Sequence, residues 1–188
     1  MKKWILQASV LALAATACKK NNDPESALPP ATQEGRNTGG CLVNGQPFVA
    51  SRYGGDLLST SPTEPLSGGF AVDSVFSLSL HRENNGVQES ISLTFKGHRT
   101  GTYRFDGLAS PPGPGYPNGV INEASFSARS GLVIDRYTTD ARHTGRATLT
   151  RADVRQGFSA GTFEFVVVNT RDSTKTLTIT SGRFDRAY

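Results

Sequence analysis

The segment 76–95 constrains the fold of this chain more than any other part of its sequence. Asn85-Gly86 is the dipeptide most typical of a two-residue β-turn, because both turn positions need a positive φ. Apolar residues alternate with polar ones on both sides of this turn: Phe76, Leu78 and Leu80 before it, and Ile91, Leu93 and Phe95 after it. A type I′ turn at Asn85-Gly86 pairs these apolar residues on one face and brings Arg82 opposite Glu89. The segment therefore predicts an antiparallel hairpin with one buried face.

Other short segments repeat the alternation, and turn residues separate them. They predict strands over 101–105, 124–129, 132–137, 145–150, 161–169 and 174–182. Asn44-Gly45 predicts a second hairpin within 41–49, and Pro47 places its second arm at a sheet edge. The polar segment 51–69 is rich in turn formers and predicts a loop. We therefore expect an all-β fold, an antiparallel β-sandwich, with a small antiparallel β-barrel as the alternative.

The first eighteen residues have the features of an export signal. Lys2 and Lys3 precede an apolar run that is too short to span a bilayer, and small residues lead directly to Cys18. This ending resembles the lipobox of bacterial lipoproteins, although Ala15 stands where that motif prefers Leu. The resemblance implies a lipoprotein signal peptide over 1–17 and acylation of Cys18. The alternative is an ordinary secretory signal in which Cys18 is incidental.

Residues 18–40 are predicted to be the lipidated Cys and a disordered tether. They are polar, contain Pro and Gly, and hold few large apolar side chains that would offset the entropy of ordering. The β domain is then expected over 41–188. Because no acidic residue directly follows Cys18, the lipoprotein resemblance implies the outer membrane of a Gram-negative envelope, on either face. If Cys18 is not lipidated, a disulfide between Cys18 and Cys41 is the alternative.

The charge pattern argues against nucleic acid as a partner. The net charge falls from +4 to +2 when Lys2 and Lys3 leave with the signal, because 18 basic residues then face 16 acidic ones. The arginines are scattered among acidic residues and form no basic run. Nucleic-acid binding needs a clustered basic surface, which this sequence lacks.

The two ends of the predicted domain resemble a known group of proteins. Residues 161–165 and 177–185 look like the closing pattern of small bacterial lipoproteins that are catalogued only as a domain of unknown function. Residues 41–48 are similar to the first hairpin of that group. The resemblance implies a β-rich envelope domain and no particular activity.

One short motif suggests catalysis. Residues 157–161 match the G-x-S-x-G nucleophile elbow, which needs its Ser on a turn from a strand into a helix. The residues that follow, 162–168, predict a strand instead, so turn glycines at the start of a strand explain the match better. A hydrolase would need two or three of four residues to converge: Ser159, His143, Asp140 and Asp153.

The three histidines do not predict a metal site. In the hairpin register His81 lies opposite Ser90, and His98 lies eight residues further on, about 26 Å along an extended strand. Ligands of one zinc ion lie only about 2 Å from it. We therefore expect neither a metal nor a cofactor.

Two further features concern the surface. Residues 110–119 contain four prolines and predict a stiff loop, in which Tyr116 is a candidate ligand-facing residue. Asp73-Ser74-Val75 and Asp172-Ser173-Thr174 resemble a short acceptor pattern for O-glycosylation, although a capped turn explains each of them equally simply.

These observations predict a lipid-anchored envelope protein that is not an enzyme and that acts as a binding or scaffolding module. Its expected partners are the membrane, through the anchor, and an unidentified protein or glycan. One alternative is a barrel-like carrier of an apolar ligand, which would enclose an empty apolar cavity. A second alternative is a hydrolase that uses Ser159.

Overall fold

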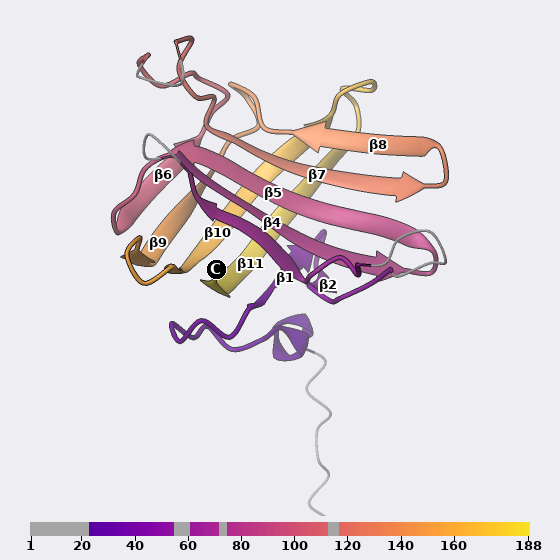
Figure 1. Ribbon diagram of the computed structural model, residues 1–188. Coiled ribbons are helices and arrows are strands. Elements are labelled where there is room, and N and C mark those ends of the chain that lie inside the picture. Colours follow the sequence, from indigo (N-terminus) through magenta and orange to yellow (C-terminus); the bar gives the residue numbers. More distant parts are fainter. Residues whose placement is uncertain (1–22, 55–60, 72–74, 113–116) are drawn as a thin grey trace, which may run out of the picture.

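The computed structural model describes residues 23–54, 61–71, 75–112 and 117–188 (Figure 1). Across these residues the chain forms a short 3₁₀ helix and eleven strands. They are η1 (Pro24–Ala27), β1 (Thr38–Val43), β2 (Gln46–Val49), β3 (Leu66–Phe70), β4 (Val75–Asn84), β5 (Val87–Lys96), β6 (Gly101–Phe105), β7 (Glu123–Ser130), β8 (Val133–Thr138), β9 (Gly145–Asp153), β10 (Phe158–Asn169) and β11 (Thr176–Ala187).

The described strands belong to one antiparallel sheet that curls into a half-barrel. Its main path runs β2-β1-β11-β10-β8-β7-β5-β4-β3, while β9 pairs with β10 and β6 pairs with β9. Figure 1 shows β10 and β11 crossing behind β4, β5 and β7. The predicted all-β antiparallel fold is confirmed. The sandwich is replaced by one continuous sheet, because β10 pairs with β9 over most of its length and with β8 at its far end.

The curl brings the two ends of the path close together. The guanidinium of Arg82 on β4 lies 4.5 Å from the ring centre of Phe48 on β2 and donates a 2.8 Å hydrogen bond to the carbonyl of Pro47. β2 is an end strand of the sheet, which is where a proline without an N–H costs least. The edge position predicted for Pro47 is confirmed.

The β4–β5 hairpin has the register that the sequence predicts. Leu78 pairs with Leu93, and Arg82 pairs with Glu89 across the ladder. Asn85 and Gly86 have φ values of 51° and 75°, as a type I′ turn requires. On the outer face, serine and threonine hydroxyls meet across the strands, for example Ser79 and Ser92 at 2.8 Å.

Replacing Gly86 by Val is expected to lower the free energy of unfolding by about 1–3 kcal/mol, the range for a side chain forced into a left-handed conformation. A side chain here meets no heavy atom within 4 Å, so backbone strain is the only cost. Gly86→Asn is the matched control, because Asn tolerates positive φ far better than Val does. Urea unfolding compares the two variants. Equal losses for both would contradict the argument from φ.

The core lies on the concave face of the sheet and joins its two halves. Phe76 on β4 lies 5.8 Å from Phe184 on β11, and Phe105 on β6 lies 6.0 Å from Phe165 on β10, measured between ring centres. Most of the large side chains in this cluster are less than 2 % exposed. The concave face is therefore filled with buried apolar side chains.

Some strands depart from the prediction. The predicted loop 51–69 ends in strand β3, which pairs with β4 along its length. Its two glycines lower β propensity, but Gly68 allows a close approach, because a Cβ there would lie 2.2 Å from the carbonyl oxygen of Ser77. β10 and β11 are also longer than predicted, extending to Phe158 and Ala187.

The structure also differs from the expected tether, because residues 23–40 lie against the domain. Leu28 is 7 % exposed, and β1 already begins at Thr38. The carboxylate of Asp185 on β11 accepts hydrogen bonds from the Thr32 hydroxyl and from the backbone N–H groups of Glu34, Gly35 and Arg36. The buried carboxylate of Asp185 thus orders this polar segment, which has too few apolar side chains to be ordered by apolar burial alone. The described residues include no helix with the length and apolar character to cross a membrane.

Candidate functional site

Ser159, the candidate nucleophile, lies within β10 and is fully buried. It pairs with Ala152 on β9, so the strand continues through it without the strand-to-helix turn of a nucleophile elbow. Asp153 lies on the same part of β9, and its carboxylate accepts the N–H of Gln156 at 3.0 Å in the β9–β10 turn. Ser159 is therefore placed as a core residue of a strand.

Asp140 and His143 form a pair at the opposite end of the β9–β10 ladder. The Nδ1 of His143 lies 3.0 Å from Asp140 Oδ1. The pKa of Asp140 is lowered, chiefly because its carboxylate accepts the backbone N–H of His143. Gly145 pairs with Phe165, six residues along β10 from Ser159, which corresponds to about 20 Å. The structure therefore does not bring Ser159 together with Asp140 and His143.

The other histidines also lie apart. His81 is on the outer face of β4, where its Nε2 lies 2.9 Å from the Ser67 hydroxyl, and burial lowers its pKa. His98 lies in the turn between β5 and β6. Across the described parts of the chain, no three His, Cys, Asp or Glu side chains are grouped as a metal site.

Asp172, in one of the two suggested glycosylation patterns, caps a turn between β10 and β11. Its Oδ1 accepts the Thr174 N–H at 3.1 Å and the Thr174 hydroxyl at 2.6 Å, and these hydrogen bonds lower the pKa of Asp172. Three of the other predicted site features fall outside the described residues. These are the lipidation site Cys18, the loop residue Tyr116, and Asp73-Ser74 of the second pattern.

Cys41 is a free thiol inside the core. It is fully buried, and burial raises its pKa to about 12, although the charge of Arg82 acts in the opposite direction. A disulfide with Cys18 would require Cys41 to leave the packed interior.

A groove that the sequence did not reveal crosses the outer face of β6, β9, β10 and β11. It consists of two adjoining hollows of ≈ 390 Å³ and ≈ 540 Å³, which share Thr102, Arg146 and Glu164. We call it the outer groove. Its side chains are mainly hydroxyls and charged groups: Thr102, Arg104, Thr144, Arg146, Thr148, Thr162, Glu164, Thr178, Thr180, Ser181 and Arg183. Glu25 and Ala31 of the N-terminal segment line one end.

A β-bulge in β11 lies beside the outer groove. Phe163 pairs with Gly182 but Phe165 pairs with Ile179, so β11 holds one more residue than β10 in this stretch. The stretch of β11 that holds the extra residue includes Ser181, which has a φ of 53°. A Cβ on Gly182 would lie 2.4 Å from the Phe163 ring, so only glycine fits there. Bulges of this kind locally bend a strand and re-aim its side chains, often next to functional sites.

The charges of the outer groove form two ion pairs and one unmatched arginine. Arg146 on β9 lies 2.6 Å from Glu164 on β10, and Arg183 on β11 lies 3.4 Å from Glu25. Arg104 on β6 has no ion pair or hydrogen bond with the described part of the chain. The side chains of Arg146 and Glu164 are 64 % and 50 % exposed, so they are accessible to a ligand.

Comparison with protein families gives a match to one of them. The model of a family described as a domain of unknown function, DUF6252, matches residues 73–187, more than half of the 188 residues. The chain belongs to the DUF6252 family. The strands of the outer groove, from β6 to β11, lie within the DUF6252 region, whereas Glu25 and Ala31 lie before it. Comparisons with curated proteins and with solved structures find no match.

The DUF6252 match agrees with one part of the resemblance drawn from the sequence. The closing pattern 161–165 and 177–185 lies inside the matched region, and a β-rich domain of unknown function is confirmed. The first hairpin, 41–48, lies before that region. In the sequence of this DUF6252 chain, Thr and Arg alternate with apolar residues in 102–104 and 146–148. The sequence does not show that these two segments pair with each other in the sheet.

Proposed function

We propose that this protein is a lipid-anchored binding module of the Gram-negative outer membrane and that the outer groove is its binding site. The location is supported by the lipobox-like ending at Cys18 after a short apolar segment. Binding rather than catalysis is supported by the groove and by the separation of Ser159 from His143.

The observation that carries the binding role is the shape and lining of the outer groove. Its two hollows have volumes within the range of ligand sites in proteins. Rows of threonine hydroxyls, which both donate and accept hydrogen bonds, suit a polar ligand that lies across several strands. The hydroxyl and charged side chains of the lining favour a polar ligand over the apolar ligand of the carrier alternative.

Replacing Cys18 by Ala is expected to release the protein from membranes, because the lipid chains on that sulfur supply the anchor. Wild-type protein should fractionate with membranes after a high-salt wash and incorporate labelled palmitate. Cys41→Ala is the control and should behave as wild type, because Cys41 is buried and carries no lipid in this scheme. Membrane fractionation of the Cys18→Ala variant after the wash would contradict the anchor.

Filling the outer groove is expected to abolish ligand binding. Thr162 is exposed on the groove floor, so Thr162→Trp places a large ring where the ligand lies. Thermal shift with a panel of neutral and acidic hexasaccharides should show stabilisation of the wild type by at least one class, and none in Thr162→Trp. Thr170→Trp, at an exposed position away from the groove, is the matched control. A panel that stabilises neither wild type nor control overturns the binding role.

A further inference from the structure

Two arginines of the outer groove face each other directly across neighbouring strands. In the β6–β9 ladder Arg104 pairs with Arg146, so their Cβ atoms are about 5 Å apart. Both side chains are exposed and both line the larger hollow. Arginine stays protonated at any physiological pH, so the pair always carries two positive charges. Like charges placed directly opposite each other weaken a sheet.

The surrounding charges compensate for only one of these arginines. Along the same row of the sheet, Glu164 on β10 pairs with Arg146 and binds its guanidinium at 2.6 Å. Arg104, on the far side of Arg146, keeps an unneutralised charge toward the groove, since no acidic side chain of the described residues contacts it. The row Arg104–Arg146–Glu164 therefore has a net charge of +1 before any ligand binds.

The groups next to this row are hydroxyls. Thr102 and Thr148, one row along the same two strands, are hydrogen-bonded to each other at 3.0 Å. Thr144, Thr178 and Thr180 line the larger hollow with Arg104. A guanidinium binds carboxylate and sulfate oxygens with two parallel hydrogen bonds, and neighbouring hydroxyls bind the hydroxyls of an extended polar chain.

We propose that Arg104 and Arg146 form an oxyanion subsite of the outer groove, and that the ligand is an acidic polysaccharide bearing carboxylate or sulfate groups. This inference rests on the binding role proposed for the same groove. A sheet that tolerates an opposed arginine pair has retained a locally unfavourable contact, which is typical of functional positions. An oxyanion bound between the two guanidiniums offsets the repulsion between Arg104 and Arg146. The arrangement of the free protein therefore favours the binding of an anionic group.

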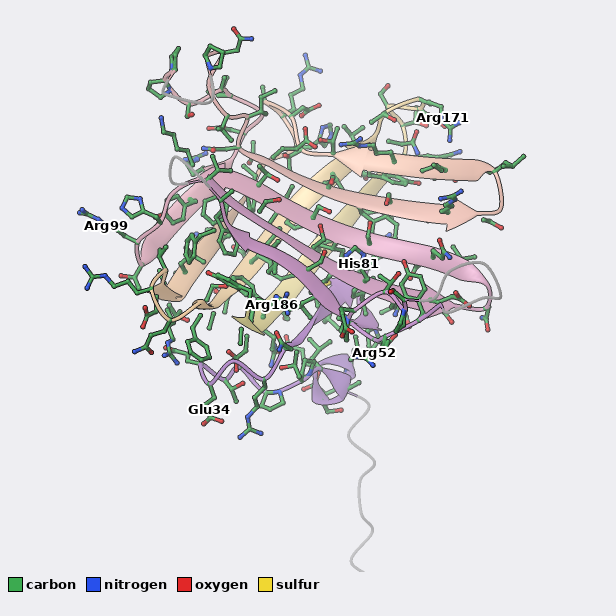
Figure 2. All side chains as sticks on the ribbon, in the orientation of Figure 1. Glu34, Arg52, His81, Arg99, Arg171 and Arg186 are labelled. Atoms are coloured by element: carbon green, nitrogen blue, oxygen red, sulfur yellow. The ribbon has the colours of Figure 1, made fainter. Side chains whose placement is uncertain are left out.

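Arg99 supplies a matched control. It lies in the turn before β6, and Figure 2 shows its side chain at the margin of the fold near β6. It does not line the outer groove. Arg99→Gln and Arg104→Gln thus make the same change of charge only five positions apart, one outside the groove and one inside it.

The test is calorimetric titration of the full-length protein in detergent with three probes: hexagalacturonate, a heparin hexasaccharide and maltohexaose. We expect wild-type protein to bind at least one acidic probe at least tenfold more tightly than maltohexaose, with affinity that falls as salt rises. Binding of hexagalacturonate identifies carboxylate as a recognised group, and binding of the heparin probe, which carries both carboxylate and sulfate, without binding of hexagalacturonate identifies sulfate. Arg104→Gln should weaken acidic binding at least tenfold, and Arg99→Gln should leave it within twofold.

Thermal unfolding without ligand gives a second readout. Arg104→Gln should raise the melting temperature by about 1–3 °C at low salt, because it removes the repulsion from Arg146. A merely structural Arg104 would lower it instead. Equal binding of maltohexaose and the acidic probes, or wild-type affinity in Arg104→Gln, overturns the oxyanion subsite and leaves the groove as a binding site. Absence of binding by all three probes overturns both proposals.

Discussion

Replacing Leu78 by Ala is expected to lower the free energy of unfolding by about 2–5 kcal/mol, the range for a core leucine whose loss leaves a cavity. Leu78 and its cross-strand neighbour Leu93 are both fully buried in the concave face of the half-barrel. Its close-packed neighbours relax only partly into the space, so the cavity persists.

Ser79→Ala is the matched control on the same strand. Ser79 points to the opposite face, where its hydroxyl meets that of Ser92 at 2.8 Å in a half-buried row. Loss of such a hydroxyl pair costs well under about 1 kcal/mol. Urea unfolding midpoints measure both variants. Equal losses would mean that both faces of β4 are packed, which is incompatible with a single concave core.

The β4–β5 hairpin could be predicted residue by residue because its information is local. The turn at Asn85-Gly86 sets the register, and the alternation on each arm checks it independently. Strand β3 could not be predicted, because its sequence lacks a local signal of this kind. Gly68 and Gly69 carry no side chain that would reveal a period, and the pairing is visible only once β4 is in place.

The outer groove escaped prediction because it depends on contacts between distant segments. The sequence shows that Arg104 and Arg146 point outward, but not that β6 pairs with β9 and places them opposite each other. The bulge at Ser181 gives no sequence signal either, since serine does not favour positive φ. For the candidate nucleophile, in contrast, the sequence suggested a site that the structure does not form. A five-residue motif matched, but the strand register separated Ser159 from His143.

The N-terminal segment illustrates a limit of composition as a guide. Residues 23–37 have the polar composition of a tether, and the group that orders them lies about 150 positions away in β11. Asp185 is 2 % exposed, and its carboxylate accepts four hydrogen bonds from this segment. Burial raises the pKa of Asp185, but the hydrogen bonds from Thr32 and the backbone N–H groups outweigh it and hold the pKa below its ordinary value of 3.8.

Replacing Asp185 by Asn is therefore expected to lower the free energy of unfolding by about 2–4 kcal/mol at pH 7, since hydrogen bonds to a charged acceptor are lost and partly buried N–H groups lose their acceptor. The amide keeps the shape of the carboxylate but offers one acceptor oxygen in place of two. Asp172→Asn is the control. Asp172 is also hydrogen-bonded, but in an exposed turn, and its loss should cost less than about 1 kcal/mol.

The pH dependence separates the charge of Asp185 from its shape. A carboxyl group whose pKa is lower in the folded state stabilises the fold above its unfolded pKa, and that contribution is lost as the pH falls through the folded pKa. The difference between wild type and Asp185→Asn should thus be constant from about pH 5 to 8 and shrink below about pH 4. Urea unfolding across this range measures it, and limited proteolysis at pH 7 should cut residues 23–37 faster in the variant. A difference that stays the same down to pH 3 would mean that the carboxylate charge does not hold the N-terminal segment, and that side-chain packing orders it instead.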